Sequence, residues 1–461
     1  MNKLIKNGIV VTASDVQRAD VAIENGVVTA VGQNLPDNGA EIVDADGCYV
    51  FPGGVDPHTH LDMPFGGTVT IDDFESGTIG FAAGGTTTIV DFCMHEKGKS
   101  LQHSLDIWHE KARGKAVIDY GFHMMVGDLR DEILDEIPKL VEEQGVSSFK
   151  VFMAYKNNLQ AEDKTLFRVL QRAKAAKALV QVHAENGDVI DALVEDALAS
   201  GNVEPVYHAL TRPPEAEGEA TARAIELARL AGAPIYIVHV TCREAVEAIS
   251  RARRRGQPVF GETCEQYLVC DHTDYERPGF EGAKYVMSPP IREKSHQEAL
   301  WNGLFNGDLM VLGSDQCSFN FKGQKELGKE DFSKIPNGGP TGEERMGILY
   351  EYGVVQGRIG LSKFVDLTST TAAKLFGLFP KKGTIAVGSD ADIVIWDPNV
   401  ERTISAATQY LKCDYSLFEG FKVHGKARDV LLRGEYVFQN NEFVGAPGTG
   451  EYVPQKPFEY K

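Results

Sequence analysis

The alternation of apolar and polar residues divides the chain into two ends of short strands and a long middle of mixed strands and helices. Residues 1–50 contain short apolar runs and an Asn25-Gly26 hairpin turn, without helical periodicity. The C-terminal end contains similar short apolar runs at 393–396, 430–432 and 436–438. We therefore expect the two ends to pair into one β-sandwich domain.

Between these ends, apolar strands alternate with amphipathic helices. The helical periods fall at 130–144, 162–178, 217–231 and 243–255. One face of the first helix carries Ile133, Leu134, Ile137, Leu140 and Val141. This alternation is typical of parallel strands joined by crossover helices, and a middle of this length suits a (β/α)8 barrel. A doubly wound open sheet is the alternative, although no Gly-x-Gly-x-x-Gly follows the first strand.

These patterns predict domain boundaries as well as a fold class. The barrel is placed at 53–382, and the β-sandwich is built from 1–52 and 383–461. The tail from Gly445 to Lys461 contains several prolines, so we expect it to be extended and to lie on a neighbouring subunit.

Composition and charge exclude several classes of protein. The 461 residues are 43% hydrophobic and 25% charged, and no apolar run approaches the roughly 20 residues of a membrane span. With 47 basic and 66 acidic residues, the net charge of −19 would repel a nucleic-acid backbone. The seven cysteines are scattered without a Cys-x-x-Cys pair, and the N-terminus has no export signal. We expect a cytoplasmic protein that binds neither nucleic acid nor membranes.

Metal-ligand residue types stand at the ends of several apolar strands. His58 and His60 follow Gly53-Gly54-Val55-Asp56-Pro57, and their spacing in a strand turns both imidazoles to one face. Later apolar strands end in the same way at His183, His239 and Asp315. A single histidine in such a place is usually a hydrogen-bonded core residue. Because the strand ends of a barrel converge on one mouth, the whole set indicates a shared metal site.

Lys150 lies within the apolar strand 146–153, where a charged amine is costly unless it has a partner. Once neutral, this amine can add carbon dioxide and become a carbamate, whose two oxygens can bridge two cations. The alternative is a buried lysine that is paired with a carboxylate.

These motifs together resemble the amidohydrolase superfamily. The likeness rests on the His-x-His after Gly-Gly-Val-Asp-Pro, on Lys150, on the two later histidines and on Asp315 after Gly-Ser. Within the superfamily, the chain is similar over essentially its full length to the hydantoinase and dihydropyrimidinase group, most of all to D-hydantoinases. The resemblance implies a homotetramer or dimer and two divalent ions, with zinc expected and manganese, cobalt or nickel as alternatives.

The resemblance also implies a role for each site residue. His58, His60, carboxylated Lys150 and Asp315 would hold one ion, and Lys150, His183 and His239 would hold the other. Ions about 3.5 to 4 Å apart would lower the pKa of a shared water to about 7, so that a hydroxide attacks the carbonyl of a cyclic ureide. Asp315 would carry the proton to the leaving nitrogen, and Tyr155 would polarise the carbonyl.

Substrate contacts are implied for Ser288 and Asn337, which on their own are ordinary turn residues. The ring substituent is expected against Met63, Phe65, Phe152 and Leu159, which would favour bulky or aromatic hydantoins.

Three other functions compete with this interpretation. A dihydroorotase would need an arginine for the substrate carboxylate at the place that Asp62 occupies, and Asp62 would repel it. An allantoinase shares the ligand set and a ureide substrate, so it stays open. A non-catalytic relative that binds protein partners, as the collapsin-response mediator proteins do, would have lost metal ligands. All six are present here.

Overall fold

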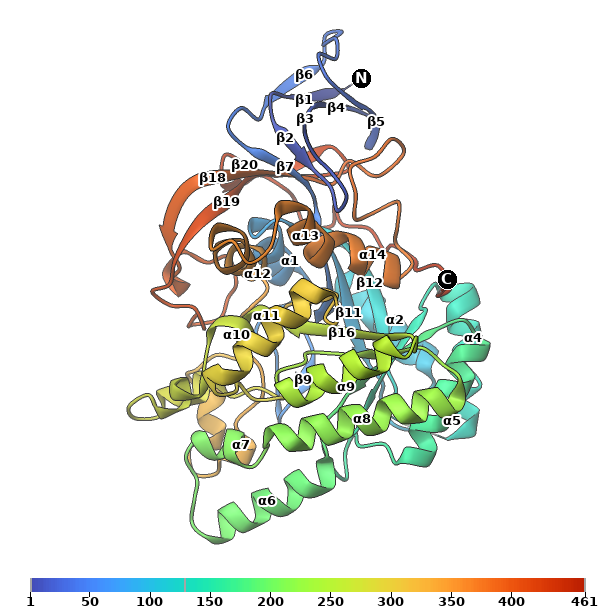
Figure 1. Cartoon of the computed structure of the whole chain (residues 1–461), viewed down its shortest axis with the longest axis vertical. Helices are drawn as coiled ribbons and strands as arrows, with labels where there is room; N and C mark the ends of the chain where they lie inside the picture. Colours follow the sequence, from blue (N-terminus) through green and yellow to red (C-terminus); the bar gives the residue numbers. More distant parts are fainter. Residues whose placement is uncertain (1, 128–129, 460–461) are drawn as a thin grey trace.

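Eight parallel strands form the centre of the molecule in the computed structural model, which describes residues 2–127 and 130–459 (Figure 1). They follow one another in chain order around a single sheet: β8 (Gly54–Thr59), β11 (Thr86–Met94), β12 (Asp119–Met125), β13 (Ser148–Phe152), β14 (Leu179–His183), β15 (Ile235–Ile237), β16 (Val259–Cys264) and β17 (Val311–Gly313). A parallel bridge between Thr59 and Gln316 brings the first and last strands together. The predicted barrel is therefore confirmed, and the open-sheet alternative is wrong.

The barrel interior is a packed core. Buried apolar side chains from several strands, including those of Val55, Val90, Phe260 and Val311, belong to one cluster inside it. Because the interior below the mouth is filled, a substrate can enter only from the carboxyl ends of the strands.

Helices cover the outside of the barrel (Figure 1). The long ones are α1 (Phe74–Ala83), α2 (Leu101–Ala112), α5 (Asp163–Ala175), α6 (Gly187–Ala199), α8 (Pro214–Ala231), α9 (Arg243–Arg254) and α11 (Gln297–Asn306). The short ones are α3 (Asp131–Leu134), α4 (Ile137–Lys139), α7 (Val206–Leu210), α10 (Glu265–Val269), α12 (Arg345–Leu349), α13 (Leu361–Val365) and α14 (Thr371–Leu375). Asp73 caps the N-terminus of helix α1, and its carboxylate accepts hydrogen bonds from the backbone N–H groups of Glu75 and Ser76. No helix among the described residues is long and apolar enough to cross a membrane.

Three of the four predicted helices are present as α5, α8 and α9, with ends that differ from the prediction by a few residues. The prediction of one helix over 130–144 is wrong. The structure breaks this segment into α3, α4 and a π-helical turn over Leu140–Gln144. Pro138 has no backbone N–H to donate to the carbonyl of Leu134, so the helix cannot continue through it. The five residues of the predicted apolar face are nevertheless buried.

Strands from both ends of the chain form the second domain, as predicted. A four-stranded sheet contains β5 (Val27–Gly32), β4 (Asp20–Glu24), β1 (Lys3–Lys6) and β6 (Glu41–Asp44). A seven-stranded sheet contains β21 (Glu442–Phe443), β20 (Glu435–Gln439), β19 (Lys422–Leu432), β18 (Ile393–Thr403), β7 (Tyr49–Pro52), β2 (Ile9–Val11) and β3 (Val16–Arg18). Ile5, Val21, Val50 and Ile393 share one buried cluster, so the two ends have a common core. The boundaries 1–52, 53–382 and 383–461 stay a prediction.

The C-terminal tail is extended, but it lies on its own barrel. Gln455 Oε1 accepts hydrogen bonds from Ser147 N at 2.9 Å and from Ser148 Oγ at 3.2 Å, and its Nε2 donates to Phe122 O at 3.1 Å. The prediction that the tail lies on a neighbouring subunit therefore does not hold for the described residues. Tyr460 and Lys461 lie outside them.

A buried ion cluster connects the two domains beside the tail. Lys382 Nζ lies 2.5 Å from Asp119 on β12 and 2.8 and 2.7 Å from Asp390 and Asp392 before β18. These aspartates are close enough together to hold a metal ion, but the ammonium of Lys382 occupies the space between them.

Replacing Lys382 with methionine should destabilise the protein by about 3–5 kcal/mol, because it leaves buried carboxylates without their common cation. The matched control is Lys381→Met, since the Lys381 side chain is 55% exposed and, among the described residues, forms an ion pair with Asp390 alone. Thermal unfolding at a fixed scan rate checks the prediction. Equal midpoints for the two variants would show that the cluster does not stabilise the junction.

Candidate metal centre and substrate cavity

The six predicted metal ligands come together at the carboxyl ends of the barrel strands. His58, Lys150 and His183 lie on β8, β13 and β14. His60, His239 and Asp315 follow β8, β15 and β17 by one or two residues. His239 and Asp315 have left-handed backbone angles, with φ of 39° and 53°. Such conformations cost about 1–3 kcal/mol each and cluster at functional sites.

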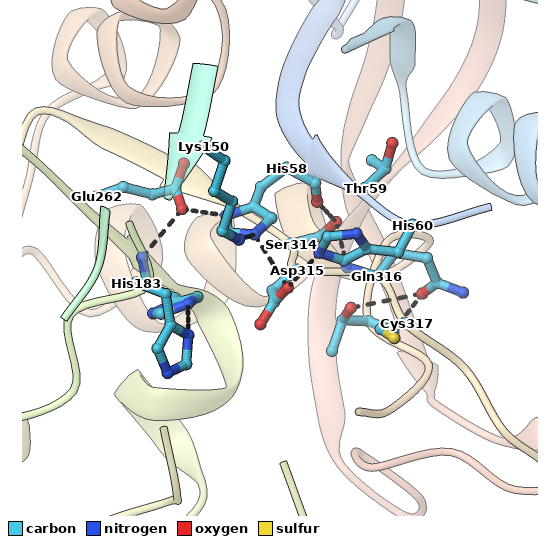
Figure 2. Close-up of polar contacts among 12 residues, drawn as sticks. His58, Thr59, His60, Lys150, His183, Glu262, Ser314, Asp315, Gln316 and Cys317 are labelled. Atoms are coloured by element: carbon cyan, nitrogen blue, oxygen red, sulfur yellow. Dashed lines mark hydrogen bonds and ion pairs between the residues drawn. The ribbon is translucent and has the colours of Figure 1, made fainter. Parts of the chain in front are cut away.

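His58, His60 and Asp315 form the first group of donor atoms (Figure 2). Asp315 Oδ1 lies 3.1 Å from His58 Nε2 and 3.2 Å from His60 Nε2. Burial alone would raise the pKa of Asp315, but the charge of His58 and the hydrogen bonds from His58 and His60 outweigh it and hold this pKa well below its usual range. Burial also lowers the pKa of His60 to about 4. An ionised carboxylate beside a neutral imidazole is the state that binds a cation.

His183 and His239 form the second group. His183 Nδ1 lies 2.9 Å from His239 Nε2, and His183 Nε2 lies 2.7 Å from Glu185 Oε2. Because the ionised Glu185 can only accept, Nε2 carries the proton and donates it in a hydrogen bond, which leaves the Nδ1 lone pair facing His239. Burial lowers the pKa of His239 well below its usual range.

Lys150 lies between the two groups. Its side chain is almost fully buried, and its Nζ is 3.0 Å from His58 Nε2. Burial lowers the pKa of Lys150 to about 8. No carboxylate of the described residues lies within 4.0 Å of Nζ, so the alternative of a carboxylate-paired lysine finds no support.

Glu262, on β16, orients two of the candidate ligands (Figure 2). Its Oε1 lies 2.5 Å from His58 Nδ1 and accepts from His239 N at 3.1 Å, and its Oε2 accepts from Tyr236 Oη at 2.8 Å. By accepting a hydrogen bond from Nδ1–H of His58, it leaves the Nε2 lone pair of the neutral imidazole facing Asp315. Sequence reasoning missed Glu262 and Glu185. Their signals were a carboxylate inside an apolar strand and the spacing His183-x-Glu185.

Replacing Glu262 with glutamine should weaken metal binding or activity by about 10- to 100-fold, as is usual for a group that orients a metal-binding histidine. The amide keeps the size of the side chain, but its oxygen is a weaker hydrogen-bond acceptor for Nδ1–H of His58. Metal titration of the stripped protein checks the prediction, with Glu185→Gln as the parallel change at His183. Wild-type affinity in Glu262→Gln would rule out the orienting role.

Buried carboxylates also fix the backbone of the ligand-bearing segments. Asp56 Oδ1 accepts from His58 N at 3.1 Å and from Ser314 N at 3.2 Å, which joins the ends of β8 and β17. Asp91 Oδ2 accepts from Thr59 Oγ1 at 2.7 Å and from Leu61 N at 2.9 Å, on either side of His60. The backbone around the first donor group is therefore held from two sides.

The predicted substrate contacts meet beside the second group. Tyr155, Ser288 and Asn337 line the same cavity, and Asn337 Nδ2 donates to Ser288 Oγ at 3.0 Å. Burial raises the pKa of Tyr155 to about 12, so its hydroxyl stays protonated and can donate. Tyr155 also has a left-handed φ of 67°.

One cavity contains all of the predicted residues except His58, which is buried behind its wall. The four predicted pocket residues, Met63, Phe65, Phe152 and Leu159, line it. Phe65 lies on a small hairpin of β9 (Pro64–Phe65) and β10 (Thr68–Val69), with its ring 5.7 Å from that of Tyr155. The sequence interpretation missed further lining residues, namely Met94, Met125, Met287, Cys317 and Gly338.

Asp62 does not line this cavity. Its carboxylate lies 3.7 Å from Lys111 Nζ. The expected repulsion between Asp62 and a substrate carboxylate is therefore weakened. A substrate with a carboxylate, such as dihydroorotate, is instead disfavoured because no described arginine lines the cavity.

The donor set suits divalent cations. Imidazole nitrogens and a carboxylate oxygen face one another at 2.9–3.2 Å. Because few of these atoms carry a hydrogen, their lone pairs are available to a cation. His60 Nδ1 and His239 Nδ1 are buried without a hydrogen-bond partner among the described residues. Nitrogen and oxygen donors gathered in this way favour zinc and related metals.

Comparisons with known proteins agree with this geometry. A family model described as "Amidohydrolase family" matches residues 49–437. The D-hydantoinase of Geobacillus stearothermophilus is 62% identical over 458 residues, which cover 99% of this chain and 97% of that protein. The dihydropyrimidinase of Rattus norvegicus is 44% identical over 462 residues, which cover 99% of this chain and 89% of that protein. A crystal structure of D-hydantoinase, 62% identical, superposes with a TM-score of 0.99 over 100% of both chains. The chain belongs to the amidohydrolase family.

Proposed function

We propose that the protein hydrolyses the ring amide bond of 5-substituted hydantoins and dihydropyrimidines to give N-carbamoyl amino acids. One observation carries this proposal: the donor atoms for metal ions and the Tyr155, Ser288 and Asn337 cluster open into the same cavity. Relatives named D-hydantoinase and dihydropyrimidinase match the chain over almost its whole length, which supports the choice of substrate.

The proposed metal centre is binuclear and contains zinc. His58, His60, Lys150 and Asp315 would hold one ion, and Lys150, His183 and His239 the other. The Lys150 amine would add carbon dioxide and lose a proton, giving a carbamate that would supply two anionic oxygen ligands. When bound, the ions supply a Lewis acid for the carbonyl and lower the pKa of the attacking water.

Residues of the chain carry the remaining steps of the reaction. Asp315 accepts a proton from the attacking water and passes it to the ring nitrogen as the carbon–nitrogen bond breaks. The protonated hydroxyl of Tyr155 donates a hydrogen bond to the carbonyl oxygen as negative charge develops there. Ser288 and Asn337 hold the other polar atoms of the ring, which keeps the reacting carbonyl beside Asp315.

The apolar cavity wall favours hydantoins with apolar substituents. Met63, Phe65, Phe152 and Leu159 offer no partner for the polar ureido group of allantoin, and no described arginine is available for the carboxylate of dihydroorotate. We propose a preference for the D-enantiomer because the relatives at high identity are named D-hydantoinases.

We also propose a cytoplasmic homotetramer or dimer. All seven cysteines are free and buried, which supports a reducing compartment.

Hydrolysis assays on metal-stripped protein test this function, with and without added zinc and bicarbonate. The substrates are the two enantiomers of 5-phenylhydantoin, then dihydrouracil, allantoin and dihydroorotate. Zinc-dependent opening of the hydantoin or dihydrouracil is expected. Activity on allantoin or dihydroorotate alone would overturn the substrate assignment, and inactivity of folded, zinc-loaded protein would favour a protein-binding role.

A further inference from the structure

We propose that Lys325 is a positioning residue that joins the two segments bearing Ser288 and Asn337, and thereby sets how tightly the substrate ring is held. The inference rests on the proposed function in one respect, namely that Ser288 and Asn337 contact the ring. The position of Lys325 itself is independent of any substrate.

Lys325 is fully buried at the start of a 3-10 turn over Lys325–Gly328. Its Nζ donates to three backbone carbonyl oxygens, those of Val286 at 2.8 Å, Pro336 at 2.7 Å and Gly338 at 2.6 Å. A lysine ammonium has three N–H groups and accepts no hydrogen bond, so all of its donors are used.

The three carbonyls belong to the segments that form the polar side of the cavity. Val286 lies two residues before Ser288, and Pro336 and Gly338 stand on either side of Asn337. The same segments also contact each other directly, from Gly338 N to Val286 O at 3.0 Å and from Asn337 Nδ2 to Ser288 Oγ at 3.0 Å. Lys325 therefore fixes the distance between Ser288 and Asn337 from behind, away from the cavity that they line.

The chemistry of this arrangement points to positioning rather than to packing alone. A buried cation is costly, and none of the described carboxylates forms an ion pair with Lys325. Burial lowers the pKa of Lys325 to about 7, whereas three converging carbonyl dipoles favour the charged form. An apolar side chain would fill the volume but would leave the carbonyls of Pro336 and Gly338 without this donor.

The backbone at Asn337 has little room to adjust. Gly338 has a φ of +136°, and a Cβ added there would lie 2.2 Å from Cys317 O. Loss of the lysine should thus move the Asn337 segment as a unit, and a displacement of about 1 Å at a substrate contact can cost about 10²-fold in rate.

A double-mutant cycle on the zinc-loaded enzyme tests the inference, with 5-phenylhydantoin as the probe. Lys325→Met should lower kcat/KM by about 10²-fold, mainly through KM, with unchanged zinc content. The double variant Ser288→Ala, Asn337→Ala should lose a similar amount. Adding Lys325→Met to it should cost no more than about threefold, because residues that act together are not additive. Lys329→Met, directly after this turn and with an exposed side chain, should match the wild type.

Additive losses would overturn the inference, because a general structural defect does not depend on Ser288 and Asn337. An unchanged kcat/KM in Lys325→Met would also overturn it.

If Lys325→Met does not fold, Lys325→Gln, which keeps two N–H donors, should give a smaller loss of the same kind. If the wild type opens no cyclic ureide, the proposed function fails. The role of Lys325 is then tested by a crystal structure of the Lys325→Met variant. Separation of Val286 from Gly338 in the variant supports the inference, and an unmoved pair refutes it.

Discussion

Replacing Lys150 with methionine should lower kcat/KM by at least about 10³-fold and reduce the amount of bound metal. The Nζ atom lies between the two groups of donor atoms, 3.0 Å from His58 Nε2. Without it, no anionic group can bridge the groups, and the several kcal/mol that metal ions contribute to the transition state are lost in part. Steady-state kinetics and metal analysis on the same sample check this result.

Lys156→Met is the matched control for that experiment. Lys156 follows Lys150 by six residues, but its side chain is 41% exposed and pairs with Asp188 and Asp191 at 3.2 Å. It should keep wild-type activity and metal content. A Lys150→Met variant that retains two ions and wild-type kcat/KM would exclude the carbamate.

The sequence was sufficient to predict the barrel, the β-sandwich and the residues that the structure gathers at the mouth. His183, His239 and Asp315 could be found because each ends an apolar strand, and the strand ends of a barrel converge. Pro138 was a visible sign of the break in the segment 130–144, but the periodicity of the apolar residues concealed it. Those residues are buried in the structure even though the helix is interrupted.

Residues whose partners are far away in the chain could not be predicted. Glu262 lies in an apolar strand, but its partner His58 is 204 positions away, so nothing in the sequence joins them. Lys325 gave no signal, because its partners are backbone carbonyls and every residue has one. The proline content of the tail predicted an extended chain, yet the surface on which it lies depends on hydrogen bonds of Gln455 with the barrel.

Replacing Asp315 with asparagine should reduce kcat by about 10²- to 10⁴-fold, the usual contribution of a proton-transfer group. The amide has nearly the same shape and keeps one oxygen beside His58 and His60, but it cannot accept and return a proton. Kinetics and metal analysis at saturating zinc check this result. Asp62→Asn is the control, since this carboxylate pairs with Lys111 outside the cavity and its loss should leave kcat unchanged.

The metal content of Asp315→Asn separates the two roles that the geometry allows for this residue. If zinc stays bound while kcat falls, proton transfer is the main contribution, because the imidazoles of His58 and His60 then suffice to hold the ion. If zinc and kcat fall together, Asp315 acts chiefly as a ligand, and the proton must reach the ring nitrogen by another route. A variant that keeps both its zinc and its kcat would remove Asp315 from the mechanism, since a neutral amide could then do all that the carboxylate does.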